Sequence, residues 1–247
     1  MNRLTACFSA ALALGSLDAH AASACDEKSA QYTACVAQLY RQPVAQWPAP
    51  QVDADVRWQE MAALPDHAPA PPENPFSEAK AELGKKLFND PKLSRSGQIA
   101  CASCHEADMA FADGRRVSFG HDRQSGRRNA PSLVMSGYST HLFWDGRGGS
   151  LEQQALHPIV DPVEMAFDIP SLLERLNADA DYRQQFAQVF GPGPITPELT
   201  GQALATFQRT LVKATRNTAF EQLLRGRPQR MSDEQLYGLH LFRTKAR

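Results

Sequence analysis

Cys101-Ala102-Ser103-Cys104-His105 is the feature that most restricts what this chain can fold into. Two thiols one helical turn apart can add to the two vinyl groups of a single porphyrin, and the adjacent imidazole can then bind the iron. A redox pair of the thioredoxin type would follow a strand of a βαβ unit, and a zinc site would need two further ligands at matching spacing. Neither context is readable in the sequence. The pattern therefore predicts one covalently bound haem c with His105 as the proximal ligand.

The N-terminus has the features of a secretory signal peptide over residues 1–21. Arg3 supplies a positive charge, an apolar stretch runs from Leu4 to Leu17, and Ala19-His20-Ala21 provides a small-x-small cleavage site. The alternatives are a buried helix or a short membrane anchor, but the run is shorter than the roughly 20 apolar residues that span a bilayer. No other stretch is long and apolar enough to cross a membrane. The sequence therefore predicts export to the periplasm.

Export changes what the other cysteines imply. Cys7 leaves with the predicted signal peptide, whereas Cys25 and Cys35 follow the cleavage site. In an oxidising compartment the simplest interpretation is a Cys25–Cys35 disulfide. The competing interpretation is a lipoprotein processing site that ends at Cys25, which would leave Cys35 unpaired.

Composition excludes some partners and marks a boundary. The chain has 26 basic and 27 acidic residues, a formal net charge of −1, so nothing in it favours nucleic acid or an anionic membrane as a partner. Its 247 residues, 43% of them hydrophobic, suffice for one sizeable core, or for one domain and the start of another. Prolines crowd the stretch from Pro43 to Pro75. We therefore assign residues 22–75 to an N-terminal extension and a Pro/Ala-rich linker.

The remaining pattern is helical, with few strand signals. Apolar residues recur at helical intervals in five segments, and a long loop rich in Gly and Arg runs from Asp113 to Gly149. The sequence thus predicts an all-α protein. A small helical segment is expected around Tyr32 to Tyr40, and longer helices from Ser77 to Phe88, from about Ile169 to Phe190, from Thr196 to Leu211, and from Ser232 to Leu241.

A short repeat connects the first of these longer helices with the last. Gly84-Lys-Lys-Leu-Phe88 precedes the haem motif, and Gly238-Leu-His-Leu-Phe242 repeats its G-x-x-L-F pattern near the end. Together with the features below, the repeat suggests that a second haem domain is beginning.

Six motifs follow one another in the second and later parts of the chain. They are Leu83-Gly-Lys-Lys-Leu-Phe88, Ile99-Ala-Cys-Ala-Ser-Cys-His105, Arg128-Asn-Ala-Pro-Ser-Leu133, Phe143-Trp-Asp-Gly-Arg147, Ser150-Leu-Glu-Gln-Gln-Ala155 and Asp161-Pro-Val-Glu-Met165. Through these motifs the sequence from about Glu78 to Arg247 resembles the bacterial di-haem cytochrome c peroxidases. The resemblance implies a cytochrome c-like peroxidatic haem domain with long loops over residues 76–214 and the truncated start of a second such domain over residues 215–247. In that family the N-terminal haem reduces hydrogen peroxide, the C-terminal haem accepts electrons from a small cytochrome c or a cupredoxin, and full-length members dimerise.

The resemblance assigns two histidine ligands to the haem iron. His105 matches the proximal ligand, and His121 matches the distal histidine that family members release on activation. Taken without the resemblance, a loop histidine such as His121 is more often a solvated surface residue. His141 and His157 match no ligand position of the family.

Further positions match the peroxide pocket and its surroundings. Glu164 matches the acid–base residue, which must take a proton from peroxide and return one to the departing oxygen; the alternative is a surface glutamate. Gln154 and Pro158 match residues that line the same pocket. Trp144 matches the tryptophan between the two haems, although it could also serve core packing. Asn129 matches a calcium ligand at the domain interface.

The sequence departs from the family where a second C-x-x-C-H is expected. No cysteine follows Cys104, and the chain stops shortly after Phe242, so we interpret it as a fragment or a premature stop. The predicted function is that of a fragment of a periplasmic di-haem cytochrome c peroxidase, an oxidoreductase that reduces hydrogen peroxide to water. The alternative is a mono-haem c-type electron-transfer protein without peroxidase turnover. A third hypothesis, a relative of the methylamine-utilisation enzymes that oxidise a partner protein, is disfavoured by His121, because the peroxidatic haem of those enzymes lacks a distal histidine.

Overall fold

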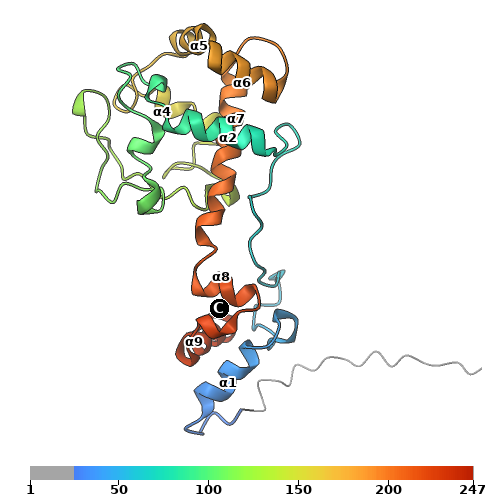
Figure 1. Ribbon diagram of the computed structural model, residues 1–247. Helices are drawn as coiled ribbons and strands as arrows, with labels where there is room; N and C mark the ends of the chain where they lie inside the picture. Colours follow the sequence, from blue (N-terminus) through green and yellow to red (C-terminus); the bar gives the residue numbers. More distant parts are fainter. Residues whose placement is uncertain (1–24, 247) are drawn as a thin grey trace, which may run out of the picture. The chain divides into compact units, whose positions relative to one another are not determined.

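The computed structural model describes residues 25–246, so the predicted signal peptide lies outside the described residues. Within this range the chain is helical, without a β-strand, which confirms the predicted all-α class (Figure 1). No described helix has the length and apolar character needed to cross a membrane. The α-helices are α1 (Tyr32–Tyr40), α2 (Glu78–Asn89), α3 (Leu151–Gln154), α4 (His157–Val160), α5 (Ile169–Ala178), α6 (Ala180–Phe190), α7 (Pro197–Thr210), α8 (Ala219–Leu224) and α9 (Asp233–Thr244).

The helix expected from Ile169 to Phe190 is wrong in one respect, because the structure divides it into α5 and α6. Asp179 interrupts the helix with an extended backbone (φ −80°, ψ 114°) and accepts hydrogen bonds from the amides of Asp181 and Tyr182. An aspartate in this position satisfies amides at the start of a new helix, so it favours an N-cap over a helix interior.

The described residues form two compact units. The central unit comprises residues 64–218, and the terminal unit combines residues 25–63 with residues 219–246. Residues 64–75, which the sequence assigns to the linker, thus pack within the central unit.

The central unit is built on α2 and α7, which cross closely (Figure 1). Ser77 caps α2 by accepting a hydrogen bond from the Lys80 amide, and Thr196 caps α7 just before Pro197. Gly84 permits the close approach, because a Cβ placed on it would lie 1.9 Å from the carbonyl oxygen of Ala203. Only glycine leaves room for the two helices to pack at this distance.

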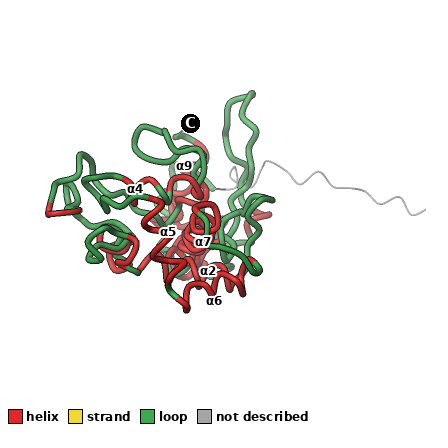
Figure 2. The backbone as a smooth tube through the Cα atoms, turned by 90° about the horizontal axis from the view of Figure 1, so that it is seen from above, coloured by secondary structure: helices red, strands yellow, loops and turns green. Residues whose placement is uncertain are grey.

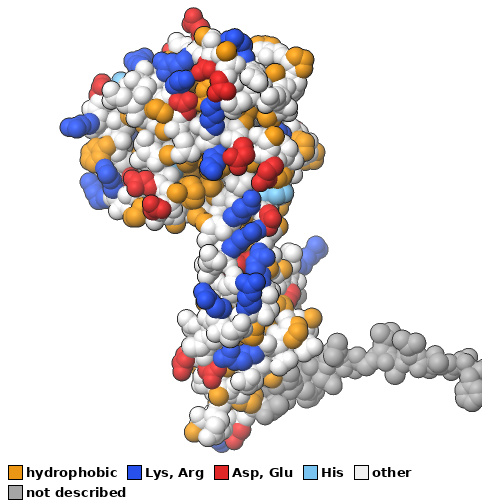
Figure 3. Space-filling model, viewed as in Figure 1, with side chains coloured by type: hydrophobic (Ala, Val, Ile, Leu, Met, Phe, Trp, Pro, Cys, Tyr) orange, Lys and Arg blue, Asp and Glu red, His pale blue; other side chains and the backbone are white. Residues whose placement is uncertain are grey.

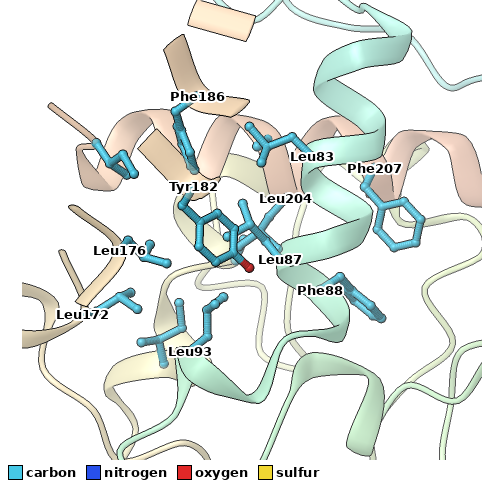
Figure 4. Packing of buried hydrophobic residues seen from close by; sticks show 14 of the residues in the cluster. Leu83, Leu87, Phe88, Leu93, Leu172, Leu176, Tyr182, Phe186, Leu204 and Phe207 are labelled. Atoms are coloured by element: carbon cyan, nitrogen blue, oxygen red, sulfur yellow. The ribbon is translucent and has the colours of Figure 1, made fainter. Parts of the chain in front are cut away.

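Apolar side chains from both helices form one end of the core, and α5 and α6 close the other (Figure 4). Each fully buried Leu or Phe of such a core contributes roughly 1.5–3 kcal/mol relative to an exposed one. This cluster fixes the end of α2, from which the chain leads into the haem motif. Its labelled members in Figure 4 are Leu83, Leu87, Phe88, Leu93, Leu172, Leu176, Tyr182, Phe186, Leu204 and Phe207.

A buried polar network fastens the segment before α2 to α7. Lys80 Nζ donates to Asn74 Oδ1 at 2.8 Å, and Asn74 Nδ2 donates to Glu152 Oε1 at 2.7 Å. Arg209 Nη1 donates to the same Glu152 oxygen at 2.7 Å. Because buried charges and amides are costly without partners, this connected set holds the segment in one position.

In the terminal unit α1 packs against α9. Cys25 and Cys35 form a disulfide, which confirms the predicted pairing. The Arg243 side chain is fully buried, forms an ion pair with Glu60 and lies near aromatic rings, including that of Trp47.

Candidate haem-binding site

Residues 99–149, which we call the loop wall, and the turns around α3 and α4 enclose a cavity of about 760 Å³ in the central unit. In Figure 2 such loops, drawn in green, extend to one side of the helices. Phe88 and Leu204 reach the cavity from α2 and α7. Its volume lies in the range typical of cofactor and ligand sites.

The haem motif forms a tight turn that directs both cysteines toward this cavity. Ser103 Oγ accepts the Ala100 amide at 3.0 Å, and the amides of Cys104 and His105 donate to the Cys101 carbonyl at 3.2 and 3.1 Å. Both thiols are free and both line the cavity. Burial raises the pKa of Cys101 to about 12. A reactive dithiol of the thioredoxin type needs a lowered pKa, so this environment disfavours that alternative.

His105 is oriented as a metal-binding histidine would be. Its Nδ1 lies 2.9 Å from the Phe111 carbonyl oxygen, so it donates there in the tautomer that places the ligand lone pair on Nε2. Left-handed backbone at Ala110 and Phe111 (φ 53° and 57°) turns this carbonyl toward the ring. Burial lowers the pKa of His105, which keeps the imidazole neutral and able to bind iron. The two thiols, this imidazole and the cavity volume together fit a haem c.

A narrow loop presents the Phe143–Arg147 segment at the cavity. Leu142 and Gly148 exchange backbone hydrogen bonds of 3.0 and 3.1 Å, and Gly146 takes the left-handed conformation that the turn requires (φ 72°). Trp144 lines the cavity but is 64% exposed, which argues against a role in core packing alone. Its Nε1 donates to the Asn129 carbonyl at 2.9 Å, so two distant parts of the loop wall are joined.

Glu164, Gln154 and Pro158, the three residues predicted for a peroxide pocket, all line this cavity. Glu164 is an exposed residue, on a turn in which its amide donates to the Asp161 carbonyl at 3.1 Å. Desolvation of its carboxyl against the turn raises the pKa of Glu164, the nearby Asp161 charge raises it further, and Arg147 opposes both effects. A raised pKa makes the carboxyl a stronger base and easier to reprotonate, as a proton-transferring group requires.

The backbone of His121 contacts the backbone of Glu164, but the His121 side chain is not part of the cavity wall. The His121 amide donates to the carbonyls of Glu164 at 2.8 Å and Val163 at 3.1 Å. Gly120 makes this contact possible, because a Cβ there would lie 2.1 Å from the Val163 oxygen. His121 Nε2 is 3.4 Å from a carboxylate oxygen of Asp122, and its buried Nδ1 has no hydrogen-bond partner among the described residues.

Asn129, His141 and His157 lie in three different environments. The Asn129 side chain donates to the Arg115 carbonyl, and within residues 25–246 no group of three or more His, Cys, Asp or Glu is arranged to hold a metal ion. His141 lines the cavity and its Nδ1 lies 3.1 Å from Thr140 Oγ1. His157 packs its ring edge against Phe143 at 5.5 Å.

Two buried polar residues of the cavity wall were among those that the sequence did not predict. Ser136 and Gln208 are both more than nine-tenths buried, both line the cavity, and each has a polar side-chain atom without a partner among the described residues. Unpaired buried polar atoms are rare, so they indicate that a bound group or water completes the site. The signal for Gln208 was a polar residue on the apolar face of α7, between Leu204 and Leu211.

Comparison with known proteins addresses the resemblance directly. The model of the family described as di-haem cytochrome c peroxidase matches residues 78–229. The chain belongs to this family. It is 42% identical over 188 residues to the methylamine utilization protein MauG of Methylophilus methylotrophus, covering 76% of this chain and 55% of that protein. It is 39% identical over 184 residues to the cytochrome c551 peroxidase of Nitrosomonas europaea, covering 74% and 54%.

A solved structure extends the comparison to the fold. The crystal structure of a MauG-like protein associated with microbial copper homeostasis superposes with a TM-score of 0.65 at 34% identity, covering 76% of this chain and 55% of that one. The chain thus spans about half the length of the relatives that it matches. The resemblance inferred from the sequence motifs is confirmed at the level of the family.

Proposed function

We propose that this chain binds one haem c through Cys101, Cys104 and His105 and belongs to a periplasmic di-haem enzyme that reduces hydrogen peroxide to water. The electrons would come from a small cytochrome c or a cupredoxin. One observation carries the proposal: Glu164 and Gln154 line the same cavity as the two free cysteines and the oriented histidine. Peroxidase names among the family relatives support it.

When bound, the haem supplies the iron at which the O–O bond of peroxide is cleaved and through which electrons pass. The protein supplies the proton chemistry. Glu164, when ionised, takes a proton from the incoming peroxide, and it then returns that proton to the departing oxygen. Its raised pKa suits both steps, because it makes the carboxylate a better proton acceptor and the carboxyl easier to form again. Gln154 can orient the peroxide by hydrogen bonding, and Pro158 completes the wall.

The test is the peroxide reaction of the Glu164→Gln variant, followed by stopped-flow absorption of the haem-loaded protein. We expect a rate about 10²- to 10⁴-fold lower, the range typical for loss of a general acid–base group. Glu174→Gln is the matched control, because Glu174 is an exposed glutamate on α5. An unchanged rate at full haem content would exclude Glu164 from the role. If the wild-type haem never reacts with peroxide, the mono-haem electron-transfer alternative is favoured.

His121 is proposed as the distal iron ligand of a resting form. The buried Nδ1 of His121 has no hydrogen-bond partner among the described residues, which supports this role. A rotation of the side chain or a movement of its loop would bring the imidazole to the iron. We expect the His121→Ala variant to lack the low-spin six-coordinate ferric spectrum of the wild-type resting state. Identical spectra would exclude His121 as a ligand.

Several further proposals concern the whole protein. Residues 1–21 would be removed on export, which the N-terminal mass of the periplasmic protein would check.

Asn129 would bind calcium together with ligands outside the described residues, which calcium titration of the Asn129→Ala variant would test. A homodimer is proposed for the complete enzyme, and sedimentation would measure it.

A second candidate is oxidation of a partner protein, because Trp144 is 64% exposed while lining the cavity. Such a tryptophan could pass an electron from a docked protein to the haem. If this candidate holds, Trp144→Phe would abolish oxidation of a protein partner but leave the initial peroxide reaction intact.

A further inference from the structure

Positive charge along the cavity wall is concentrated in a few arginines of the loop wall. Arg127, Arg128 and Arg147 line the cavity, whereas none of the described residues that line it is a lysine. On the face shown in Figure 3, basic and acidic side chains are interspersed on the loop side of the central unit. The cavity wall likewise includes acidic residues, so it is not uniformly apolar, and its arginines are the groups that could bind an anion.

Two of these arginines share one carboxylate. Arg128 Nη1 lies 3.0 Å from one oxygen of Asp145, and Arg147 Nη1 lies 2.8 Å from the other. Hydrogen bonds from Arg147 and then Arg128 lower the pKa of Asp145 to about 2, so the carboxylate stays ionised. The three side chains, which we call the arginine pair with its bridging aspartate, carry a net charge of +1.

The position of the pair is well defined. Arg147 stacks on the Phe143 ring with its guanidinium carbon 3.6 Å from the ring centroid. The reciprocal hydrogen bonds between Leu142 and Gly148 close the loop that carries both Asp145 and Arg147. A stacked, tethered guanidinium loses less entropy on binding an anion than a freely rotating one.

Each guanidinium still has donors to offer. A guanidinium has five N–H donors, and the contacts with Asp145 are made through Nη1 of each arginine. Both side chains are about half exposed, at 51% and 50%, which leaves them accessible from the cavity mouth. The geometry suits a second planar carboxylate, which arginine binds in a bidentate manner.

A haem c brings two such carboxylates. The thiols of Cys101 and Cys104 would hold its vinyl groups, and its two propionate carboxylates would remain free for other residues of the cavity wall. An ionised carboxylate that moves from water to a protein site needs a cationic or hydrogen-bonding partner. We propose that Arg128 and Arg147 bind a haem propionate, with Asp145 holding the two guanidiniums in place. This inference rests on the covalent haem c of the proposed function.

This site would also link the propionate to the acid–base residue. Arg147 lowers the pKa of Glu164, against the effects of desolvation and of Asp161. A propionate bound to Arg147 would weaken this effect, so the cofactor carboxylate and the catalytic carboxyl would be coupled through one arginine.

The experiment compares Arg147→Gln, Arg128→Gln and the double variant in the full haem-loaded protein. The control is Arg116→Gln, which removes the same charge from the same loop at an exposed position outside the cavity wall. Covalent haem is first measured by intact mass. The haem reduction potential is then measured from pH 5 to pH 8, and the propionate bending bands are recorded by resonance Raman spectroscopy.

We expect the double variant to shift the ferric-to-ferrous ratio at pH 7 about tenfold toward the ferric form, which equals about 59 mV for one electron. The sign follows because an unpaired propionate stabilises the more positive ferric state. Loss of the arginines also raises the propionate pKa, so the potential should fall with rising pH in the variants and vary less in the wild type. The Raman propionate bands should shift in the variants and stay unchanged in Arg116→Gln.

Two outcomes would overturn the inference. Full haem content with unchanged Raman bands and an unchanged pH dependence would show that the propionates bind elsewhere. Equal shifts in Arg116→Gln and Arg147→Gln would reduce the effect to overall charge. Absence of covalent haem from the wild type would instead refute the proposed function on which the inference depends, and intact mass distinguishes this case from the others.

Discussion

The central unit contains two regions that are stabilised in different ways. The helical frame (α2, α5, α6 and α7) is held by apolar packing around residues such as Leu87 and Leu204, which are almost completely buried. The loop wall, residues 99–149, is held by single backbone hydrogen bonds, left-handed residues and exposed ion pairs, and it borders a cavity of about 760 Å³. The frame has an apolar core of its own, whereas the loop wall surrounds a cavity.

Phe88 joins the two regions. Its ring lies 5.1 Å from that of Phe207 in the frame, and 6.4 Å from the rings of both His105 and Phe111 in the loop wall. The difference between the regions suggests that the frame folds on its own contacts, whereas the loop wall depends on the bound haem as its missing apolar core.

The double variant Cys101→Ser/Cys104→Ser should lose all covalent haem, because thioether bonds need both thiols. We expect the helical circular dichroism signal of the frame to persist, while limited proteolysis cuts the loop wall far faster than in the wild type. Ala102→Ser is the control, since it changes the same turn and keeps both thiols. Equal protease resistance of the loop wall without haem would show that it does not need the cofactor as a core.

Gly84→Ala should destabilise the frame by about 3 kcal/mol, the upper range for overpacking, because the new methyl group would overlap the Ala203 backbone. Urea unfolding measures this change. Gly238→Ala in α9 is the matched control, as a Cβ there meets no atom within 4 Å. That control should be neutral or stabilising by about 0.5–1 kcal/mol. Similar values for both variants would contradict the close helix crossing.

Gly120→Ala should act on the chemistry more than on the frame. The added methyl would collide with the carbonyl oxygens of Val163 and Glu164 and displace the acid–base residue. A displacement of about 1 Å can cost roughly 100-fold in rate. Gly126→Ala tests the same loop at a position where the nearest atom is 3.4 Å away, and it should retain the wild-type peroxide rate. A wild-type rate in Gly120→Ala would show that the close contact of Gly120 with Val163 and Glu164 is not needed for the peroxide reaction.

Sequence reasoning worked well for the frame because its signals are local. The N-caps at Ser77 and Thr196 and the apolar spacing along α2 and α7 are readable within single segments. It failed at Asp179, where apolar spacing continues across the junction of α5 and α6 and hides an N-cap. The Cys25–Cys35 disulfide was predictable from proximity and export, without knowledge of the fold.

For the site, sequence motifs identified single functional residues but not the contacts between residues that are distant in sequence. Cys101, Cys104, His105 and Glu164 followed from local patterns and family resemblance. The arginine pair with its bridging aspartate was not predictable, because Arg128 and Arg147 lie far apart in sequence and meet only through Asp145. The spacing of His121 likewise carried no information about where its imidazole points, which depends on the backbone contact with Glu164.

The smallest effect concerns the electrostatics of the cavity rather than its architecture. Asp161→Asn removes a negative charge that raises the Glu164 pKa, although burial of the carboxyl is the larger cause. The variant keeps Oδ1, which accepts the Val163 amide at 2.8 Å, so the turn should persist.

Because Glu164 must be ionised to accept the peroxide proton, the rate should rise with pH through its pKa. Without the Asp161 charge this pKa falls, so the profile should move to lower pH and the variant should be the faster enzyme on the acidic limb. Stopped-flow peroxide kinetics across pH would measure the shift, and Asp108→Asn, at an exposed site outside the cavity wall, should leave the profile in place. A shift to higher pH would mean that the conformation of the turn, and not the Asp161 charge, controls the pKa of Glu164.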